Sequence, residues 1–171
     1  MARFGFMIAG IVAAAVLGAF IGPGTALAAC TDPPAPGVNW QRCAFDGLDL
    51  TSVDLSGARL RDGSFFRSDL SGSDLSKTNA FRAKFVSAVL REVKLDGAKL
   101  SEADFTKADL TGASFKGTDL RRAHFFHAIL RRVDLTGARL RGADLTRADL
   151  SGATWIDGKR VCAEGSLGRC N

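Results

Sequence analysis

Large apolar residues recur at every fifth position of the chain from Trp40 to Trp155, with no break in the count. Of the 24 residues at these positions, here termed centres, 23 are large and apolar, and the exception is Ala80. The residue two places before a centre is small except for Leu48, and it is Ala in 13 of the 24 repeats. Asp occurs ten times directly before the centre, and Gly occurs nine times two places after it.

A period of five fits neither a regular helix nor a flat strand. A helix with a period of about 3.6 and a strand with a period of about two both rotate a five-residue pattern off a single face. The pattern therefore predicts a chain that makes a short extended step and then turns, every five residues. The centre and the small residue before it point inward. Gly after the centre is typical of a corner that needs a positive φ, and the Asp before it is expected to bond the turn backbone.

The spacing of the Phe residues predicts how many steps make one coil. Five Phe centres lie twenty residues apart, as rings stacked in successive coils would: Phe45, Phe65, Phe85, Phe105 and Phe125. Twenty residues per coil means four repeats and a square cross-section. The 24 repeats then give six coils, about 29 Å tall at about 4.8 Å per strand. At the irregular repeat around Ala80, a local bulge is expected to rotate Phe81 inward.

The repeat resembles that of a known family. Residues 108–112 (ADLTG) and 148–152 (ADLSG) are similar to the A-[DN]-L-x-x unit of the pentapeptide-repeat proteins, and the resemblance covers residues 38–155. It implies an all-β fold, a right-handed quadrilateral parallel β-helix with about six coils of 20 residues. Residues 38–155 are accordingly predicted to form this β-helix.

Residues 1–29 are predicted to be a cleavable signal peptide, which makes the protein secreted or extracytoplasmic. Arg3 precedes an uncharged apolar run over residues 4–21, and residues 26–28 (ALA) supply the small residues of a cleavage site. An uncleaved membrane anchor is one alternative, because the run reaches the lower limit of spanning length. Residues 27–30 also resemble a lipobox. A membrane is expected as a partner only if Cys30 is lipidated.

The four Cys residues are expected to form disulfides that close both ends of the solenoid. An even number of Cys in an exported chain favours disulfides, and four Cys allow three connectivities. We favour the sequence-local pairs because the solenoid separates them, and other exported members of the family have similar Cys-flanked ends. These pairs are Cys30 with Cys43 and Cys162 with Cys170. Residues 30–37 and 156–171 are predicted to be the caps, and Trp40 and Trp155 are expected to cover the open core.

The composition argues against catalysis and metal binding. The 171 residues include no Tyr, 2 His and 2 Met. His124 and His127 flank the centre Phe125, so they are expected outside, without a third metal ligand. The chain has no phosphate loop, no Ser-His-Asp grouping and no HExxH motif. We therefore expect no catalytic residue, no metal site and no cofactor. A β-helix enzyme acting on polysaccharides remains an alternative because Asp residues are numerous.

The outer faces are expected to carry the function, and their charge is uneven. The face with centres 60 to 140 has eight cations against three carboxylates, whereas the face with centres 50 to 150 has a net charge of −2. We define the basic face by these eight cations: Arg59, Arg61, Arg82, Lys99, Arg121, Arg122, Arg139 and Arg141. The partner predicted for it is an anionic envelope polymer or acidic lipid.

A second surface feature is an apolar strip along one corner. It consists of residues at outward positions where the repeat normally has Ser, Thr or Asp: Phe66, Val86, Val89, Phe126 and Ile129. The strip is interrupted by Thr106 and Asp109. A row of exposed apolar residues is a candidate interface, either for side-by-side self-association or for docking of another protein.

These patterns predict a non-enzymatic exported scaffold or binding module that presents rigid faces to a protein or an anionic envelope partner. The family resemblance implies one alternative, since cytoplasmic members resemble DNA in shape and charge and protect type II topoisomerases. That role needs an acidic rod in the cytoplasm. This chain has a formal net charge of +5 and a predicted export signal, so the alternative is disfavoured and no specific nucleic-acid partner is expected.

Overall fold

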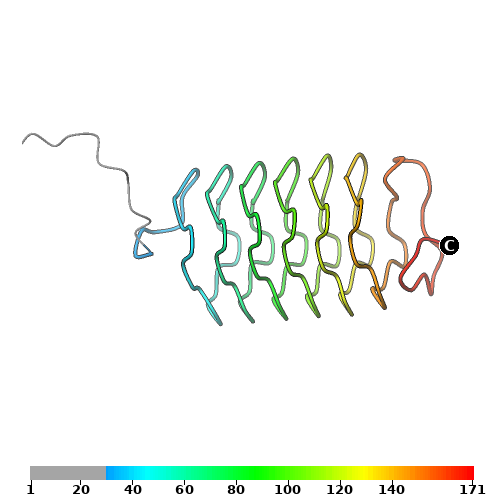
Figure 1. Cartoon of the computed structure of the whole chain (residues 1–171), viewed down its shortest axis with the longest axis horizontal. Helices are drawn as coiled ribbons and strands as arrows, with labels where there is room; N and C mark the ends of the chain where they lie inside the picture. The colour runs from blue at the N-terminus through cyan, green and yellow to red at the C-terminus, as the bar shows by residue number, and fades with distance from the viewer. Residues whose placement is uncertain (1–29) are drawn as a thin grey trace, which may run out of the picture.

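A computed structural model describes residues 30–171 as a stack of coils along one axis (Figure 1). The predicted signal peptide lies outside the described residues. Within residues 30–171 there is no helix, and each side of a coil contributes a single β-bridge residue rather than a longer strand. Every parallel bridge joins residues twenty apart, from Asn39 with Arg59 to Asp134 with Thr154. No helix in this part of the chain is long and apolar enough to cross a membrane.

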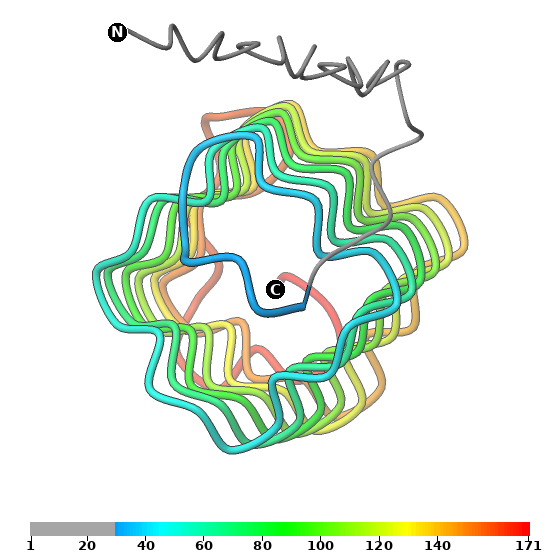
Figure 2. The ribbon, with the colours of Figure 1, turned by 90° about the vertical axis from the view of Figure 1, so that its left-hand side faces the viewer.

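Viewed along its axis, each coil has four sides and the successive coils superimpose (Figure 2). Bridges follow one another at intervals of five residues around the coil and twenty residues along the stack. The fold is therefore the right-handed quadrilateral β-helix that the sequence predicts.

Backbone hydrogen bonds join each coil to its two neighbours, as the repeat around Leu110 illustrates. The Leu110 N–H donates to the Ile129 carbonyl at 2.8 Å, and the Gly112 N–H donates to the Arg131 carbonyl at 2.8 Å, both in the next coil. The Asp109 N–H donates in the opposite direction, to the Ala88 carbonyl at 3.0 Å. The same three bonds recur around the inner coils, so the ladder continues on all four sides.

Each corner is a four-residue turn with a left-handed residue in its third position. After Leu110, the Ala113 N–H closes the turn on the Leu110 carbonyl at 2.9 Å, and Gly112 has a φ of 73°. A positive φ at this position is the feature of a type II turn. All corner positions from residue 37 to residue 152 have positive φ, and fourteen of them are not Gly. The Gly pattern therefore identifies the corners correctly, although it marks fewer than half of them.

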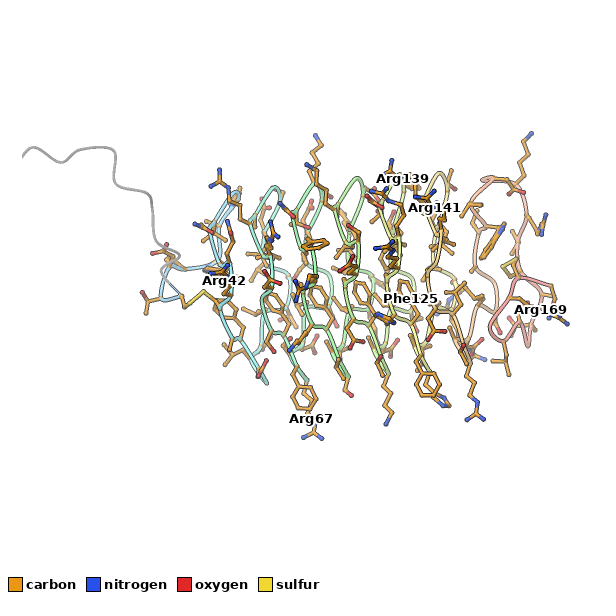
Figure 3. The ribbon with its side chains drawn as sticks, in the orientation of Figure 1. Arg42, Arg67, Phe125, Arg139, Arg141 and Arg169 are labelled. Carbon is orange, nitrogen blue, oxygen red and sulfur yellow. A yellow bond between two sulfur atoms is a disulfide. The ribbon has the colours of Figure 1, made fainter. Side chains whose placement is uncertain are left out.

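The core is a column of stacked centres. All centres are buried except Leu140, Leu145 and Trp155 in the last coil. The five Phe residues spaced by twenty stack with ring centroids 5.0 to 5.6 Å apart, which confirms the predicted coil length. The ring of Phe125 lies within the coils (Figure 3). Phe115, on the opposite side of the coil, meets this stack edge-on at Phe105 and Phe125.

The row of small residues also points inward. Where this row has a hydroxyl in place of Ala, the hydroxyl donates to a backbone carbonyl: Ser68 to Phe65, Ser73 to Leu50, Thr78 to Leu75 and Thr118 to Leu95, at 2.7 to 2.8 Å. These bonds allow polar atoms to be buried in the core at little cost. The one large residue of the row, Leu48 in the first coil, is 48% exposed.

The Asp residues before the centres have the structural role that the sequence predicts. Each of the ten accepts a hydrogen bond from the backbone N–H two residues later. At Asp109 the donor is the Thr111 N–H at 3.0 Å, and the Thr111 hydroxyl donates to the same oxygen at 2.7 Å. The carboxylate thus supplies an acceptor for an N–H that the ladder between coils does not use.

The predicted bulge at Ala80 is wrong. Ala80 is fully buried as the centre, and its N–H donates to Lys99 at 2.9 Å, in the regular register. The Phe81 carbonyl accepts from Asp62 at 2.9 Å in the preceding coil. Rotating Phe81 inward would break these bonds to both neighbouring coils. Phe81 therefore stays outside, half-buried, with the Arg61 guanidinium 5.0 Å from its ring centroid.

Disulfides close the N-terminal segment between Cys30 and Cys43 and the C-terminal segment between Cys162 and Cys170. Trp40 is buried, and its indole N–H donates to the Asp32 carbonyl at 3.1 Å.

Trp155 packs against the core and is half-buried. The chain after Trp155 turns back and forms antiparallel bridges to the last coil, Thr154 with Val161 and Asp149 with Leu167. These bridges lie on two of the four sides. The centres on the other two sides, Leu140 and Leu145, stay partly exposed.

Replacing a centre is expected to destabilise the protein far more than replacing the residue after it. Leu110→Ala should lower the free energy of unfolding by about 2–5 kcal/mol, because it leaves a cavity in the column. Thr111→Ala removes one partly exposed hydrogen bond and should cost less than about 1 kcal/mol. Urea denaturation of the two variants measures the difference, and equal effects would contradict the register.

Candidate anion-binding face

The structure places all eight cations of the basic face on one side of the solenoid. They form a row along the middle of the face and rows along the corner that follows it: Arg59, Lys99 and Arg139 in the middle, Arg61, Arg121 and Arg141 at the corner, and Arg82 and Arg122 just beyond. Arg139 and Arg141 project from the upper side in Figure 3, away from Arg67 on the lower side. Successive positions of a row are one coil spacing of about 4.8 Å apart. In the middle row the cations alternate with Asn79 and Asp119, so they lie two coil spacings apart.

Asp119 holds two of these cations side by side. Arg121 donates to both oxygens of the Asp119 carboxylate, from Nε at 2.8 Å and from Nη2 at 2.7 Å. Arg139, one coil further, donates to Asp119 Oδ2 at 2.8 Å. The hydrogen bonds from Arg121, and then from Arg139, hold the pKa of Asp119 well below its usual range. Asp119 therefore stays ionised and orients two guanidinium groups on adjacent coils.

The remaining pairs on this face are looser. Arg61 and Arg82 approach Asp62 at 3.6 and 3.5 Å, and Arg122 approaches Glu102 at 3.5 Å. Such exposed pairs contribute little to stability and exchange readily.

Within residues 30–171, three cations of the face have no ion pair with a carboxylate. In the part of the chain that the structure describes, Arg59, Lys99 and Arg141 have no carboxylate within 4.0 Å. The face thus combines oriented guanidinium groups with unpaired cations.

A hollow of about 770 Å³ borders the basic face at Arg82 and Arg122. Two further hollows lie on the face itself. One of them, of about 720 Å³, crosses the full width of the face, from the corner glycines to the opposite corner row. Its lining includes Gly97, Gly117 and Gly137 on one side and Arg61, Phe81, Ser101 and Arg121 on the other. A second hollow of about 510 Å³ adjoins the corner and shares Phe81, Ser101 and Arg121 with the first.

Phe81 is a surface residue of this face that our sequence reasoning missed. The guanidinium groups of Arg61 and Arg82 lie 5.0 and 5.9 Å from its ring centroid. The available signal was the same one that identified Phe66 and Phe126, namely an aromatic residue directly after a centre. The expected bulge at Ala80 hid it.

The apolar strip is exposed but not continuous. Phe126 and Ile129 are 37% and 39% exposed, and the other three members are half-buried. Arg67 lies over the Phe66 ring at 4.7 Å, and the His127 ring meets Phe126 edge-on at 4.4 Å. Polar neighbours therefore cover part of both rings, and the role of the strip in association stays a prediction.

The two His residues lie outside the core, as the sequence predicts. His124 and His127 are exposed, and His127 Nε2 is 3.4 Å from Arg147 Nη1. Over residues 30–171 no three His, Cys, Asp or Glu side chains gather as a metal site would require.

Comparison with known families gives a match over most of the chain. A family model described as pentapeptide repeats matches with 8 copies, over residues 35–65, 43–85, 88–125 and 118–154. No curated protein matches the chain.

Similar solved structures come from cyanobacteria and a plant. HetL, a pentapeptide repeat protein involved in heterocyst differentiation regulation in Nostoc, is 30% identical, with 72% of this chain and 70% of that chain covered and a TM-score of 0.45. Rfr23 from Cyanothece is 24% identical, with 70% and 88% covered and a TM-score of 0.43. A pentapeptide repeat protein of the Arabidopsis thaliana thylakoid lumen is 28% identical, with 72% and 83% covered and a TM-score of 0.39.

Asp119→Asn is expected to destabilise the protein at neutral pH and to lose this effect in acid. Because the pKa of Asp119 is lowered in the folded state, its contribution is present above the ordinary Asp pKa of about 4 and is lost as the pH falls toward the folded-state pKa. Urea unfolding of both proteins should show a stability gap that is constant above about pH 5 and narrows below about pH 4.

Lys99→Gln is the matched control for Asp119→Asn. It removes a charge from the same row, but from a residue without an ion pair, so its stability gap should not change over this acidic range. If the Asp119→Asn gap were equally insensitive to acid, the two guanidinium groups would not be bonded to Asp119.

Proposed function

Because the chain belongs to the pentapeptide-repeat family, we propose that it is an exported, non-enzymatic scaffold whose basic face binds an anionic polymer of the cell envelope. The observation that carries the proposal is the placement of eight cations on one wall, with at least one cation from each of five successive coils. An extended polyanion laid along the solenoid axis meets a cation at each step.

The backbone ladder makes this wall a preformed binding surface. Cations from Arg59 to Arg122 are attached to main chain that is hydrogen-bonded to both neighbouring coils, and the main chain of Arg139 and Arg141 is bonded to the preceding coil. Asp119 further orients two of the cations. Binding to such a surface requires little ordering of the protein, and lost order is a main cost of association. Point charges also favour a flexible polyanion over a partner with one fixed shape, because binding requires only that the negative charges of the ligand match the spacing of the cations.

Export is supported by the cysteines. Both disulfides are of a kind that persists in oxidising compartments and is rare in the cytosol. The disulfide partner of Cys30 is Cys43, and a Cys30 sulfur in this bond has no thiol to carry a lipid. Together with the apolar segment of residues 4–21, this favours release from the membrane over lipid anchoring.

A non-enzymatic role is supported by what the carboxylates do. The ten Asp residues that precede centres each bond a turn N–H, and Asp119 also binds two Arg residues. A general acid in a glycosidase needs a raised pKa. The hydrogen bonds at Asp119 lower its pKa instead, and the backbone bond from Thr51 lowers that of Asp49. The positive sign of the basic face likewise disfavours imitation of DNA.

Replacing Arg121, Arg139 and Arg141 together with Ala is expected to abolish binding of an anionic polymer. Wild-type affinity for polyglutamate or polygalacturonate, measured by isothermal titration calorimetry, should fall steeply as salt is raised, because screening weakens exposed charge pairs. Arg67, Arg132 and Arg147 lie on other parts of the coil, and their triple replacement removes the same charge as a control. Equal loss in both triple variants would mean that net charge, and not this face, determines binding.

Peptide mapping of the exported protein under non-reducing conditions is expected to link Cys30 with Cys43 and Cys162 with Cys170. The N-terminus of the purified protein should lie after the small residues at 26–28. A diacyl or triacyl group on Cys30, detected by mass spectrometry, would instead make the protein a membrane-anchored lipoprotein.

A further inference from the structure

We propose that Phe81 and the cations around it form a subsite for one sugar ring of an acidic polysaccharide, with the ring stacked on Phe81 and its carboxylate bound by Arg121 or Arg139. This inference rests on the proposed function, because it names the class of polymer that the basic face takes. It adds the one aromatic residue of that face, which a purely ionic surface does not need.

The Phe81 ring is surrounded by Arg61 and by the two hollows. The Arg61 guanidinium, from the preceding coil, lies 5.0 Å from the ring centroid. In the direction of the following coils, the ring borders both hollows together with Ser101 and Arg121. Phe81 thus has a cation on its N-terminal side and open space on its C-terminal side, and Arg61 also lines the larger of these two hollows.

The space between Phe81 and Arg121 along the solenoid axis is wide enough for one flat ring in contact with a group on each side. Phe81, Ser101 and Arg121 occupy the same corner position in three successive coils, so Phe81 and Arg121 are separated by two coil spacings, roughly 9.6 Å. Ser101, between them, has a short side chain and leaves the gap unfilled. A ring in contact with groups on both sides needs two contacts of about 3.5–4.0 Å each, or roughly 7–8 Å.

The chemistry of the gap fits a sugar ring that bears an acid. An aromatic face carries partial negative charge and attracts the positive C–H edge groups of a pyranose. The lining supplies polar partners for ring hydroxyls at Asn79 and Ser101, and cations for a carboxylate at Lys99, Arg121 and Arg139. A guanidinium can bind a carboxylate through two parallel hydrogen bonds.

The dimensions of the two hollows suit a polymer. Their lining contains six cations against two carboxylates, Asp119 and Glu102. From Arg61 to Arg139 and Arg141 these cations extend over four coil spacings, roughly 19 Å along the axis. A chain of several sugars therefore has cations along its length and a single stacking platform at Phe81.

Other polyanions fit this arrangement less well. Proteins that bind single-stranded nucleic acid stack successive bases on several aromatic residues, whereas this face has only Phe81 among its outward side chains in residues 30–171. A lipid surface would require the aromatic ring to protrude. Phe81 is half-buried beside Arg61 and Arg82 instead.

The test compares Phe81→Ser with Phe66→Ser in the full-length, disulfide-bonded chain. Phe66 occupies the same position at another corner and also has an Arg over its ring, so it is a matched control. Polygalacturonate is titrated against polyglutamate of equal charge and neutral dextran at low ionic strength. Phe81→Ser should weaken polygalacturonate binding about five- to tenfold and leave polyglutamate binding unchanged, whereas Phe66→Ser should change neither.

A second variant guards against an indirect effect of losing Phe81. Ser101→Phe fills the gap while keeping Phe81, so it should also weaken polygalacturonate binding selectively. Unchanged polygalacturonate binding in Phe81→Ser overturns the subsite. Binding of single-stranded DNA that is tighter than that of polygalacturonate and is lost in Phe81→Ser overturns the sugar assignment.

The failure of this inference can be told apart from failure of the proposed function. If both polyanions bind, and binding is lost with Arg121, Arg139 and Arg141 but not with Phe81, the basic face stands and the subsite is refuted. If neither polyanion binds the wild-type chain at low ionic strength, both proposals fail.

Discussion

Backbone hydrogen bonding between coils is the constraint on which the rest of the molecule depends. In the inner coils each centre donates to a carbonyl nineteen residues later, and the residue before it donates to a carbonyl twenty-one residues earlier. Both bonds require the same coil length throughout. One extra residue in a coil would put that coil out of register with both neighbouring coils. Every later side chain would then be displaced by one position around the square. The unbroken five-residue count from Trp40 to Trp155 is the sequence record of this requirement.

The ladder uses only some of the backbone groups, and the local chemistry of each corner supplies partners for the rest. Asp before a centre accepts the N–H that points out of the ladder, and the left-handed residue after the centre turns the chain. These tasks occupy two outward positions in each repeat, the one before the centre and the one two residues after it. The position directly after the centre has no such task, and it is there that Arg61, Phe81, Arg121 and Arg141 stand. This row of the candidate site is therefore built from positions that the fold leaves free, whereas Arg59, Lys99 and Arg139 stand directly before a centre.

Inward positions could be predicted from the sequence because burial and stacking act on every coil alike. The Phe column and the turn-bonding Asp residues follow from repetition. Single departures from the repeat could not be predicted in this way. Burying Phe81 would gain about 1.5–3 kcal/mol, but it would disrupt hydrogen bonds to two coils, a cost that residue types do not reveal. The pairing of Asp119 with Arg121 and Arg139 depends on rotamers, and the half-burial of Trp155 depends on where the last segment folds back.

The equal spacing of coils has a consequence for how such a molecule changes length. Removing or duplicating any twenty consecutive residues between Gly57 and Gly137 joins two cut ends that already occupy the same place on the square. Every side chain beyond the junction keeps its face and is displaced only along the axis. The protein can thus gain or lose whole coils while its disulfide-closed ends stay as they are. The length of the basic face can therefore change only by whole coils.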